Sequence, residues 1–166
     1  MRPARSDDGL AVAGVHVRSW QAAYRGLLPD AYLDGLRAEE RMDRYTFGST
    51  DPVAPHTMVA VEDGTVRGFA TTGPCREAET HGIGELQALY VDPSSWGGGI
   101  GRILIHAARS RLGEQGYSAA VLWVLMGNER ARRFYRLDGW EEEDAFRHEV
   151  VWGVPVDECR FRRRLD

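Results

Sequence analysis

The stretch that decides the fold is ELQALYVDPSSWGGGIGRILIHAARSRLGEQG, residues 85–116. It begins with an apolar run over 85–91 that is typical of a strand and is stopped by Asp92-Pro93. After a cluster of glycines the apolar residues recur at helical spacing, and Gly116 closes the predicted helix. The buried stripe of this helix is predicted to consist of Ile100, Ile103, Leu104, Ala107 and Leu112.

The glycine cluster between this strand and this helix, WGGGIGR at residues 96–102, has the features of an anion-binding site. Glycines let the backbone turn sharply, so that several N–H groups can face one concavity. The positive end of the following helix points at the same place. A phosphate or pyrophosphate is therefore the expected ligand, and a flexible glycine turn without a ligand is the alternative.

Two common phosphate-binding motifs are excluded by the spacing. A P-loop requires Gly-Lys-Ser/Thr, whereas Gly101 is followed by Arg102. A dinucleotide fingerprint requires a glycine at its sixth position, which is Arg102 when counted from Gly97 and Leu104 when counted from Gly99.

Upstream of this unit the sequence predicts two helices and then two strands. Asp7 and Asp8 can cap the first helix. Its apolar residues at helical spacing are Leu10, Ala13, Val17, Trp20 and Tyr24. Pro29 begins a second helix that extends to about Arg44. The residues expected to face inward on it are Leu33, Leu36 and Met42. Strands are predicted over 56–61 and 66–72, joined by a tight turn.

Downstream the pattern gives a strand over 119–125, a helix over about 128–137 and two strands within 140–165. This order of elements is typical of an α/β or α+β sandwich with a mixed sheet. Because no repeat, low-complexity tract or long linker divides the chain, we predict a single domain over residues 1–166.

The composition is ordinary for a globular protein of 166 residues, with 43% hydrophobic and 28% charged residues. A formal net charge of −4 disfavours a general nucleic-acid binder. The chain has no run of about 18 apolar residues and no apolar signal core near Met1, which predicts a cytoplasmic protein without a membrane partner. Cys75 and Cys159 lack metal-ligand spacing and are expected to be buried or half-buried free thiols.

Four segments together resemble the GNAT superfamily of N-acetyltransferases over nearly the whole chain. ALYVDPSSWGGGIGRILI (88–105) is similar to the family's acetyl-CoA motif, with Gly99 and Gly101 at its two small positions. LMGNERARRFYRLDGW (125–140) is similar to its second motif, VPVDECRFRRRL (154–165) to its closing strand, and HVRSWQAAYRGLLPDAYLDGL (16–36) to its first helices. In one departure, Trp96 stands where the family has Gln or Arg, so we expect that side-chain contact to be lost or replaced by packing.

The resemblance implies a GNAT-type mixed, mostly antiparallel sheet of six to seven strands flanked by about four helices. The short N-terminus is expected to leave the first strand abbreviated. It also implies transfer of an acetyl group from acetyl-CoA to a primary amine by direct attack in a ternary complex, with a small-molecule amine as acceptor. Two alternatives are a non-catalytic acyl-CoA-binding or sensing domain and an acetyltransferase acting on protein N-termini or lysines. The oligomeric state is left open, a homodimer included.

By the same resemblance, the co-substrate would lie between the strand ending at Val91 and the strand 119–125, which part from each other. Its pantetheine arm would bind backbone groups of Leu89, Tyr90 and Val91. The pyrophosphate would be held by Gly97, Gly98, Gly99, Ile100, Gly101 and Arg102. Asn128 is expected to cap its helix, to contact the co-substrate, or to do both.

Glu85 and Tyr135 are the expected catalytic residues. An alkylamine is mostly protonated at neutral pH, because its pKa is about 10.4, so a base is needed. Some family members carry a catalytic Glu at the position of Glu85, which by strand alternation would share a face with Gln87 and Leu89. Tyr135 matches the family's usual acid for the leaving thiolate. A salt-bridged or surface Glu and a core aromatic are the respective alternatives.

A second base position used in the family is Trp123 here, which cannot accept a proton. On the acceptor side the candidates are Trp20, Tyr24 and Tyr32, whose spacing core packing explains equally well.

The acidic run 141–144 is expected to be a solvated turn, and Arg160, Arg162 and Arg164 a solvated strand edge. No metal is predicted, because the histidines lack ligand spacing. They are His16, His56, His81, His106 and His148.

Overall fold

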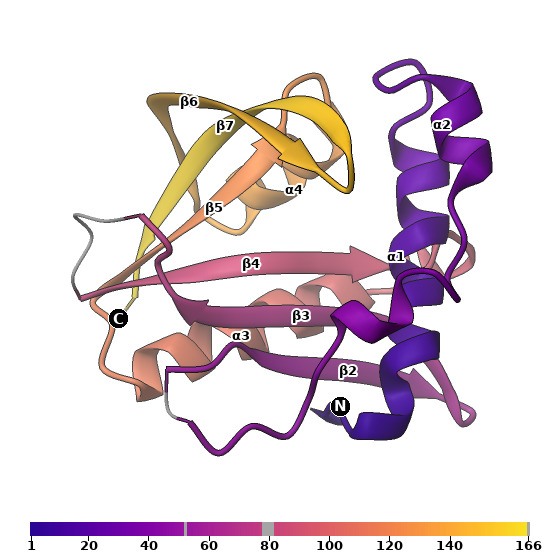
Figure 1. Ribbon diagram of the computed structural model, residues 1–166. Helices are drawn as coiled ribbons and strands as arrows, with labels where there is room; N and C mark the ends of the chain where they lie inside the picture. The colour runs from indigo at the N-terminus through magenta and orange to yellow at the C-terminus, as the bar shows by residue number, and fades with distance from the viewer. Residues whose placement is uncertain (52, 78–81, 166) are drawn as a thin grey trace.

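The computed structural model describes residues 1–51, 53–77 and 82–165. Within these ranges seven strands form one sheet in the order β1-β2-β3-β4-β5-β7-β6 (Figure 1). The strands are β1 (Arg2–Pro3), β2 (His56–Glu62), β3 (Thr65–Pro74), β4 (Ile83–Val91), β5 (Ala119–Leu125), β6 (Glu141–Val151) and β7 (Val154–Arg164). Among these described strands only β4 and β5 are parallel neighbours. The mixed, mostly antiparallel sheet with a short first strand is therefore confirmed.

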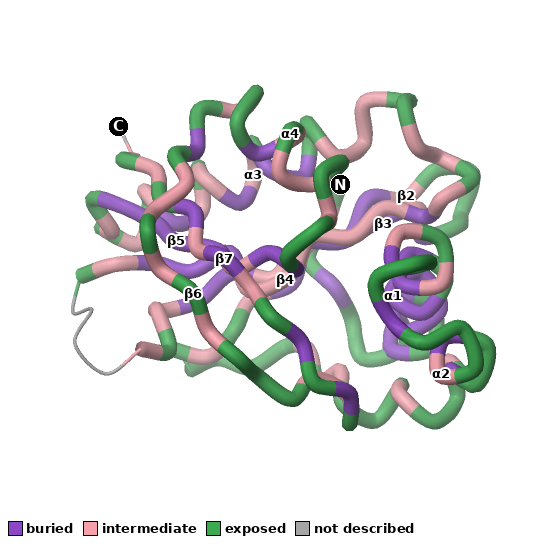
Figure 2. Tube along the Cα trace, turned by 90° about the horizontal axis from the view of Figure 1, so that it is seen from above, coloured by how far each residue is buried: buried purple, intermediate pink, exposed green. Residues whose placement is uncertain are grey.

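The described part of the chain also contains four α-helices: α1 (Gly9–Ala23), α2 (Asp30–Gly35), α3 (Ile100–Glu114) and α4 (Glu129–Leu137). Short 3-10 turns lie at Ser6–Asp8, Met42–Arg44 and Pro93–Ser95. In Figure 1, α3 passes behind the strands and α1 crosses the sheet near the end of β4, and Figure 2 shows the same arrangement from above. None of the helices in the described ranges has the length and apolar character that crossing a membrane requires.

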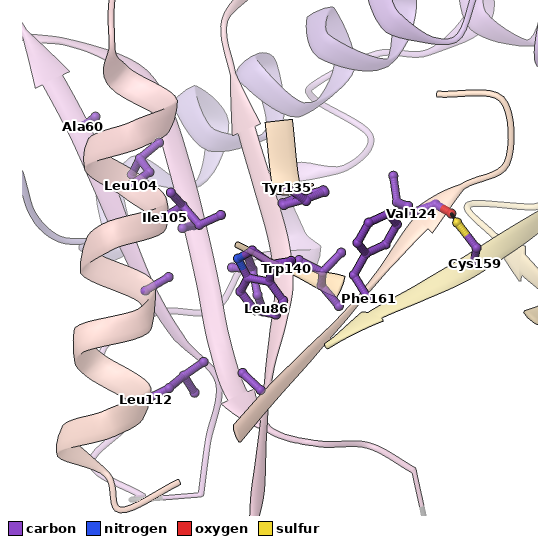
Figure 3. Packing of buried hydrophobic residues seen from close by; sticks show 14 residues of the cluster. Ala60, Leu86, Leu104, Ile105, Leu112, Val124, Tyr135, Trp140, Cys159 and Phe161 are labelled. Atoms are coloured by element: carbon purple, nitrogen blue, oxygen red, sulfur yellow. Dashed lines mark hydrogen bonds between the residues drawn. The ribbon is translucent and has the colours of Figure 1, made fainter. Parts of the chain in front are cut away.

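The core is divided between the two faces of the sheet. On one face, α3 and α4 pack on the strands, with Ile105 directed toward Leu86 and Trp140 (Figure 3). On the other face, α1 and α2 pack against the ends of β5 and β7 around Trp20 and Val156. A third cluster lies between α1 and the β2–β3 hairpin. Each face of the sheet thus packs against its own helices.

The hairpin turns follow directly from their residues. β2 and β3 are joined through Asp63 and Gly64, which have φ values of 49° and 73°. β6 and β7 are joined through Trp152 and Gly153, with φ values of 53° and 81°. Two successive residues with positive φ form the tight turn whose twist matches that of the flanking strands.

Two helix predictions need correction. The second helix ends at Gly35 rather than near Arg44, because Leu36 is already in an extended conformation. Leu36 is buried as expected, but Met42 is 37% exposed. In α3 the buried residues are Leu104, Ile105, Ala108 and Leu112, whereas Ile103 is 54% exposed. Ile103 and Ile105 are equally apolar, so only packing on the sheet decides which of them faces inward.

The charged tail also differs from the prediction. The acidic run lies in β6 and is paired with arginines instead of forming a solvated turn. Glu142 accepts hydrogen bonds from Arg132 and Arg136, and Glu143 accepts one from Arg160. The alternating arginines of β7 lie on an interior strand, between β5 and β6, and not on a sheet edge.

Gly68 in β3 lies close to both β4 and α3. A Cβ at this position would be 2.9 Å from the Tyr90 carbonyl oxygen and 3.0 Å from Leu104 Cδ1. We expect Gly68→Ala to lower the free energy of unfolding by about 1–3 kcal/mol, because a strand or helix must shift. Urea unfolding measures this, with Gly35→Ala as the control, since a Cβ there meets no atom within 4 Å. The control should change stability by less than about 0.5 kcal/mol, and equal changes in both variants would contradict the tight approach.

Candidate active site

β4 and β5 pair at only one end. Their pairing covers the first three residues of each strand and stops at Glu85 opposite Val121. β5 remains paired with β7 along its whole length and turns away from β4 (Figure 1). The edge of β4 beyond Glu85 therefore faces a gap, and the expected parting of the two strands is confirmed.

A bulge in β4 changes which side chains share a face. The register with β3 shifts at Gln87 and leaves this residue without a partner. Leu86 and Leu89 consequently both pack toward α3, although an unbroken strand would send them to opposite faces. Tyr90 packs toward α1. The expectation that Glu85 shares a face with Leu89 is wrong, because Leu89 packs with Leu86 toward α3, whereas Glu85, one residue before Leu86, points to the side of Tyr90.

The turn before α3 presents backbone donors. Gly97 and Gly99 have φ values of 82° and 88°, a conformation that side chains other than glycine rarely adopt. In the described residues no acceptor is found for the N–H groups of Gly97, Gly99, Ile100 and Gly101. These donors lie at the positive end of α3, so the turn has the chemistry of a phosphate site.

The end of β4 is fixed by side chains from two other elements. The Val91 carbonyl accepts hydrogen bonds from Ser19 Oγ at 2.9 Å and from Trp96 Nε1 at 2.8 Å. The Arg130 guanidinium lies over the Trp96 ring, 4.0 Å from its centroid. Trp96 thus supports the strand end and holds a cation beside the turn, which is the packing role expected at this position.

A cavity of about 580 Å³ is lined jointly by the glycine turn, both parted strands and α1. The predicted site residues that line it are Trp20, Tyr24, Glu85, Leu89, Tyr90, Val91, Gly97, Gly99, Ile100, Gly101, Arg102, Asn128 and Tyr135. Gly98 and Tyr32 are not part of the lining. The Tyr32 hydroxyl instead donates to the Trp152 carbonyl at 2.8 Å.

Tyr135 reaches the cavity from α4, whose start is fixed by a cap. Asn128 Oδ1 accepts a hydrogen bond from the Ala131 N–H at 3.2 Å, which confirms the capping role of Asn128. Tyr135 is 8% exposed and packs edge-on against Phe134. Burial raises the pKa of the Tyr135 hydroxyl, and nearby Tyr90 raises it further. The hydroxyl is therefore protonated at neutral pH, and Tyr135 is both a core residue and a cavity residue.

Glu85 is buried, with 2% exposure, and is held by Arg76. Arg76 Nε lies 3.2 Å from Oε1 and 3.1 Å from Oε2, and Nη2 donates to Oε1 at 2.5 Å. The Arg76 backbone N–H adds a hydrogen bond to Oε2 at 3.0 Å. The carboxylate in turn raises the pKa of the Arg76 guanidinium. Glu85 is therefore salt-bridged, which is one of the alternatives to a catalytic role.

His16 lines the cavity, although the sequence pattern did not predict it as a site residue. Its ring stacks on Tyr90 with centroids 4.1 Å apart and contacts Trp152 at 4.0 Å. His16 Nδ1 is hydrogen-bonded to the Tyr45 hydroxyl. Burial lowers the pKa of His16 well below its usual value, so the ring is neutral at pH 7. Its place four residues before Trp20, on the same helix face, is the signal that could have found it.

Glu158 is a second missed residue. It lines the cavity from β7, and its side chain is 14% exposed. Arg147 Nε donates to Glu158 Oε2 at 2.7 Å. The alternation of β7 could have found it, because Glu158 continues the inward face of Val154 and Val156.

No group of three or more His, Cys, Asp or Glu side chains able to hold a metal ion occurs in the described ranges. His81 lies outside these residues. That the chain needs no metal stays a prediction.

Comparison with known proteins gives a match between residues 18–140 and the acetyltransferase (GNAT) family. An uncharacterized N-acetyltransferase of Bacillus subtilis (strain 168), YuaI, is 33% identical over 128 residues, covering 77% of this chain and 72% of the relative. An uncharacterized N-acetyltransferase of Archaeoglobus fulgidus is 35% identical over 121 residues, covering 72% of this chain and 80% of the relative. The crystal structure of PaiA N-acetyltransferase from Thermoplasma acidophilum in complex with coenzyme A has the same fold, with a TM-score of 0.76 and 20% identity over 98% of this chain and 96% of that one.

The buried Tyr135 hydroxyl predicts a specific loss of stability at alkaline pH. The unfolded chain releases a tyrosine proton near pH 10, whereas burial raises the pKa in the folded chain. The stabilisation is complete below about pH 10 and is lost as the pH rises toward the folded value. Between about pH 9 and pH 11, Tyr135→Phe should therefore lose roughly 1 kcal/mol less unfolding free energy than the wild type. Urea unfolding at both pH values measures the difference, and equal losses would mean that the hydroxyl is solvated.

Proposed function

This chain belongs to the GNAT family of acetyltransferases and is an acetyl-CoA-dependent N-acetyltransferase, and from that premise we propose that it acetylates a small primary amine by direct attack in a ternary complex. The observation that carries the proposal is the single cavity that joins the glycine turn, the gap between β4 and β5, and α1. A co-substrate entering from the turn and an amine entering from the side of α1 would meet between the parted strands. The coenzyme A complex of PaiA, which shares the fold, supports this reading.

In this proposal the pyrophosphate of acetyl-CoA is bound by the turn formed by residues 97–102. The four N–H groups for which the described residues hold no acceptor supply directed donors, and Arg102, Arg130 and Arg133 add positive charge to the cavity wall. Gly98 lies outside the lining and its N–H already donates to the Ser95 carbonyl at 3.4 Å, so it would not bind the pyrophosphate directly. Asn128 would contribute through its cap, which positions α4 against the cavity.

The pantetheine arm is proposed to run along Leu89, Tyr90 and Val91. Support comes from the open edge of β4, whose backbone groups on this side have no neighbour among the described strands after Glu85. The Val91 carbonyl already accepts two hydrogen bonds, so the free backbone groups there would be the Val91 N–H and those of Leu89. A backbone N–H fixed in this position would stabilise negative charge on the thioester carbonyl, an effect of about 2.7–4 kcal/mol in comparable sites.

The reaction requires side chains that remove protons from the amine and supply one to the leaving thiolate. A protonated amine loses two protons as its N–C bond forms and the C–S bond breaks; one ends on the coenzyme A thiol and one reaches solvent. We assign the donor to sulfur to Tyr135, which burial keeps protonated. We assign the first acceptor of the amine's protons to Glu85, acting through water. Arg76 is already paired with the Glu85 carboxylate, so a water molecule would carry the proton between the amine and Glu85.

Two alternatives differ from this proposal in what they predict. A non-catalytic acyl-CoA-binding domain would bind the co-substrate without turnover. A protein acetyltransferase would need an open acceptor side, whereas here the tip of the β6–β7 hairpin is tied to α2 by the Tyr32–Trp152 hydrogen bond and stacks on Trp20. This closure favours a small amine. A cytoplasmic location and the absence of nucleic-acid and membrane partners stay predictions from the sequence.

The function itself is tested by co-substrate binding and turnover. Acetyl-CoA should raise the melting temperature, since a ligand at a hundred times its Kd adds about 2.7 kcal/mol of stability. Free thiol should then appear only when an amine from a panel is added. Binding without thiol release for any amine would favour the non-catalytic alternative, and the absence of any thermal shift at saturating acetyl-CoA would refute the proposal.

Tyr135→Phe should lower kcat by about a hundredfold or more while acetyl-CoA affinity stays nearly unchanged, because the variant removes only the proton donor. Tyr117→Phe is the matched control, since Tyr117 packs on the same core cluster but does not line the cavity. If Tyr135→Phe lost affinity and turnover in equal measure, Tyr135 would be a packing residue instead.

A further inference from the structure

The acceptor side of the cavity contains a carboxylate that the proposed chemistry leaves without a role. β7 alternates between the two faces of the sheet, with Cys159 and Phe161 packed toward α3 and Val154 and Val156 packed toward α1. Glu158 continues the second row and lines the cavity with its side chain 14% exposed. A carboxylate this far from bulk water has a partner or a ligand.

The two carboxylates that line the cavity, within the described residues, are Glu85 and Glu158, and they differ in what they can still bind. Both oxygens of Glu85 are occupied by Arg76 through its guanidinium and its backbone N–H. Arg147 occupies only Oε2 of Glu158. In the described part of the chain no donor is found for Oε1, which leaves one charged oxygen for an incoming cation.

The groups around Glu158 can bind the apolar part of an organic cation. Burial raises the pKa of Tyr24 and of Tyr90, and in both cases the negative charge of Glu158 raises it further. Both hydroxyls therefore stay protonated and add no negative charge beside Glu158. The rings of Trp20 and Tyr24 lie 5.0 Å apart, centroid to centroid, and Val156 adds aliphatic surface. Aromatic faces beside a carboxylate attract an ammonium group and its apolar substituent.

We propose that Glu158 Oε1 binds the ammonium group of the acceptor, and that the acceptor is a primary amine carried on an apolar aliphatic or aromatic body. The inference rests on the proposed function, because it names the acceptor class of that same site. Arg147 acts as a positioning residue: its guanidinium holds Oε2 while it lies over the Trp123 ring, 4.4 Å from the centroid. Glu85, occupied by Arg76, takes no part in this binding step.

The experiment measures binding rather than turnover. Isothermal titration calorimetry compares 2-phenylethylamine and hexylamine with their neutral analogues 2-phenylethanol and hexan-1-ol, with and without saturating coenzyme A. The wild type should bind each amine about tenfold tighter than its alcohol, because a charge-assisted hydrogen bond is lost in the alcohol. Ethanolamine, which lacks the apolar body, should bind more weakly than hexylamine.

Glu158→Gln should reduce the preference for amine over alcohol to within about twofold. Glu158→Asp, which keeps the charge, should retain part of that preference, and this second variant separates loss of charge from loss of folding. Glu149→Gln is the control, because Glu149 is an exposed residue of β6 outside the cavity lining.

Three results would overturn the inference: an unchanged amine preference in Glu158→Gln, equal binding of amines and alcohols by the wild type, or no binding of either up to millimolar concentration. Failure to bind coenzyme A would instead count against the proposed function, since the titrations without coenzyme A still measure the amine preference.

Discussion

The rest of the structure depends on where the pairing of β4 and β5 stops. If β4 and β5 stayed paired past Glu85 and Val121, the sheet would be continuous and there would be no gap between these two strands. β5 can leave because β7 takes its other edge along the full length of the strand. β4 can stand alone because its end is tied elsewhere: Ser19 and Trp96 hold the Val91 carbonyl, and Arg18 pairs with Asp92. Contacts with other elements therefore hold β4 and β5 apart and keep the gap open.

The two faces of the sheet give the cavity two chemically different ends. On the face of α3, the arginines suit an anion, as do the backbone N–H groups that have no acceptor within the described part of the chain. On the face of α1, the rings are neutral, since burial lowers the pKa of His16 and raises that of Tyr24. There each carboxylate is paired with an arginine, Glu85 with Arg76 and Glu158 with Arg147. Glu158 keeps one oxygen without a donor in the described residues, so this end suits the ammonium group of an acceptor, which must lose its proton before the nitrogen attacks.

Features that depend on neighbouring residues in the sequence could be predicted. Asp92-Pro93 and the glycines fix the strand, the turn and the start of α3 within a few residues of each other, so the sequence pattern is sufficient there. The unpredicted features all require distant partners. The bulge at Gln87 exists only in register with β3, and the Arg76–Glu85 pair joins a loop to β4. His16 likewise acquires its surroundings only when the β6–β7 hairpin folds over α1.

The central claim is that the parted strands admit a thioester whose pyrophosphate rests on the turn before α3. The most direct measurement is a crystal structure of this protein with bound coenzyme A. It should show phosphate oxygens within hydrogen-bond distance of the N–H groups of Gly97, Gly99, Ile100 and Gly101, and the thiol between β4 and β5 near Tyr135. Coenzyme A bound on any other surface, with the gap between the strands filled by side chains, would contradict the account.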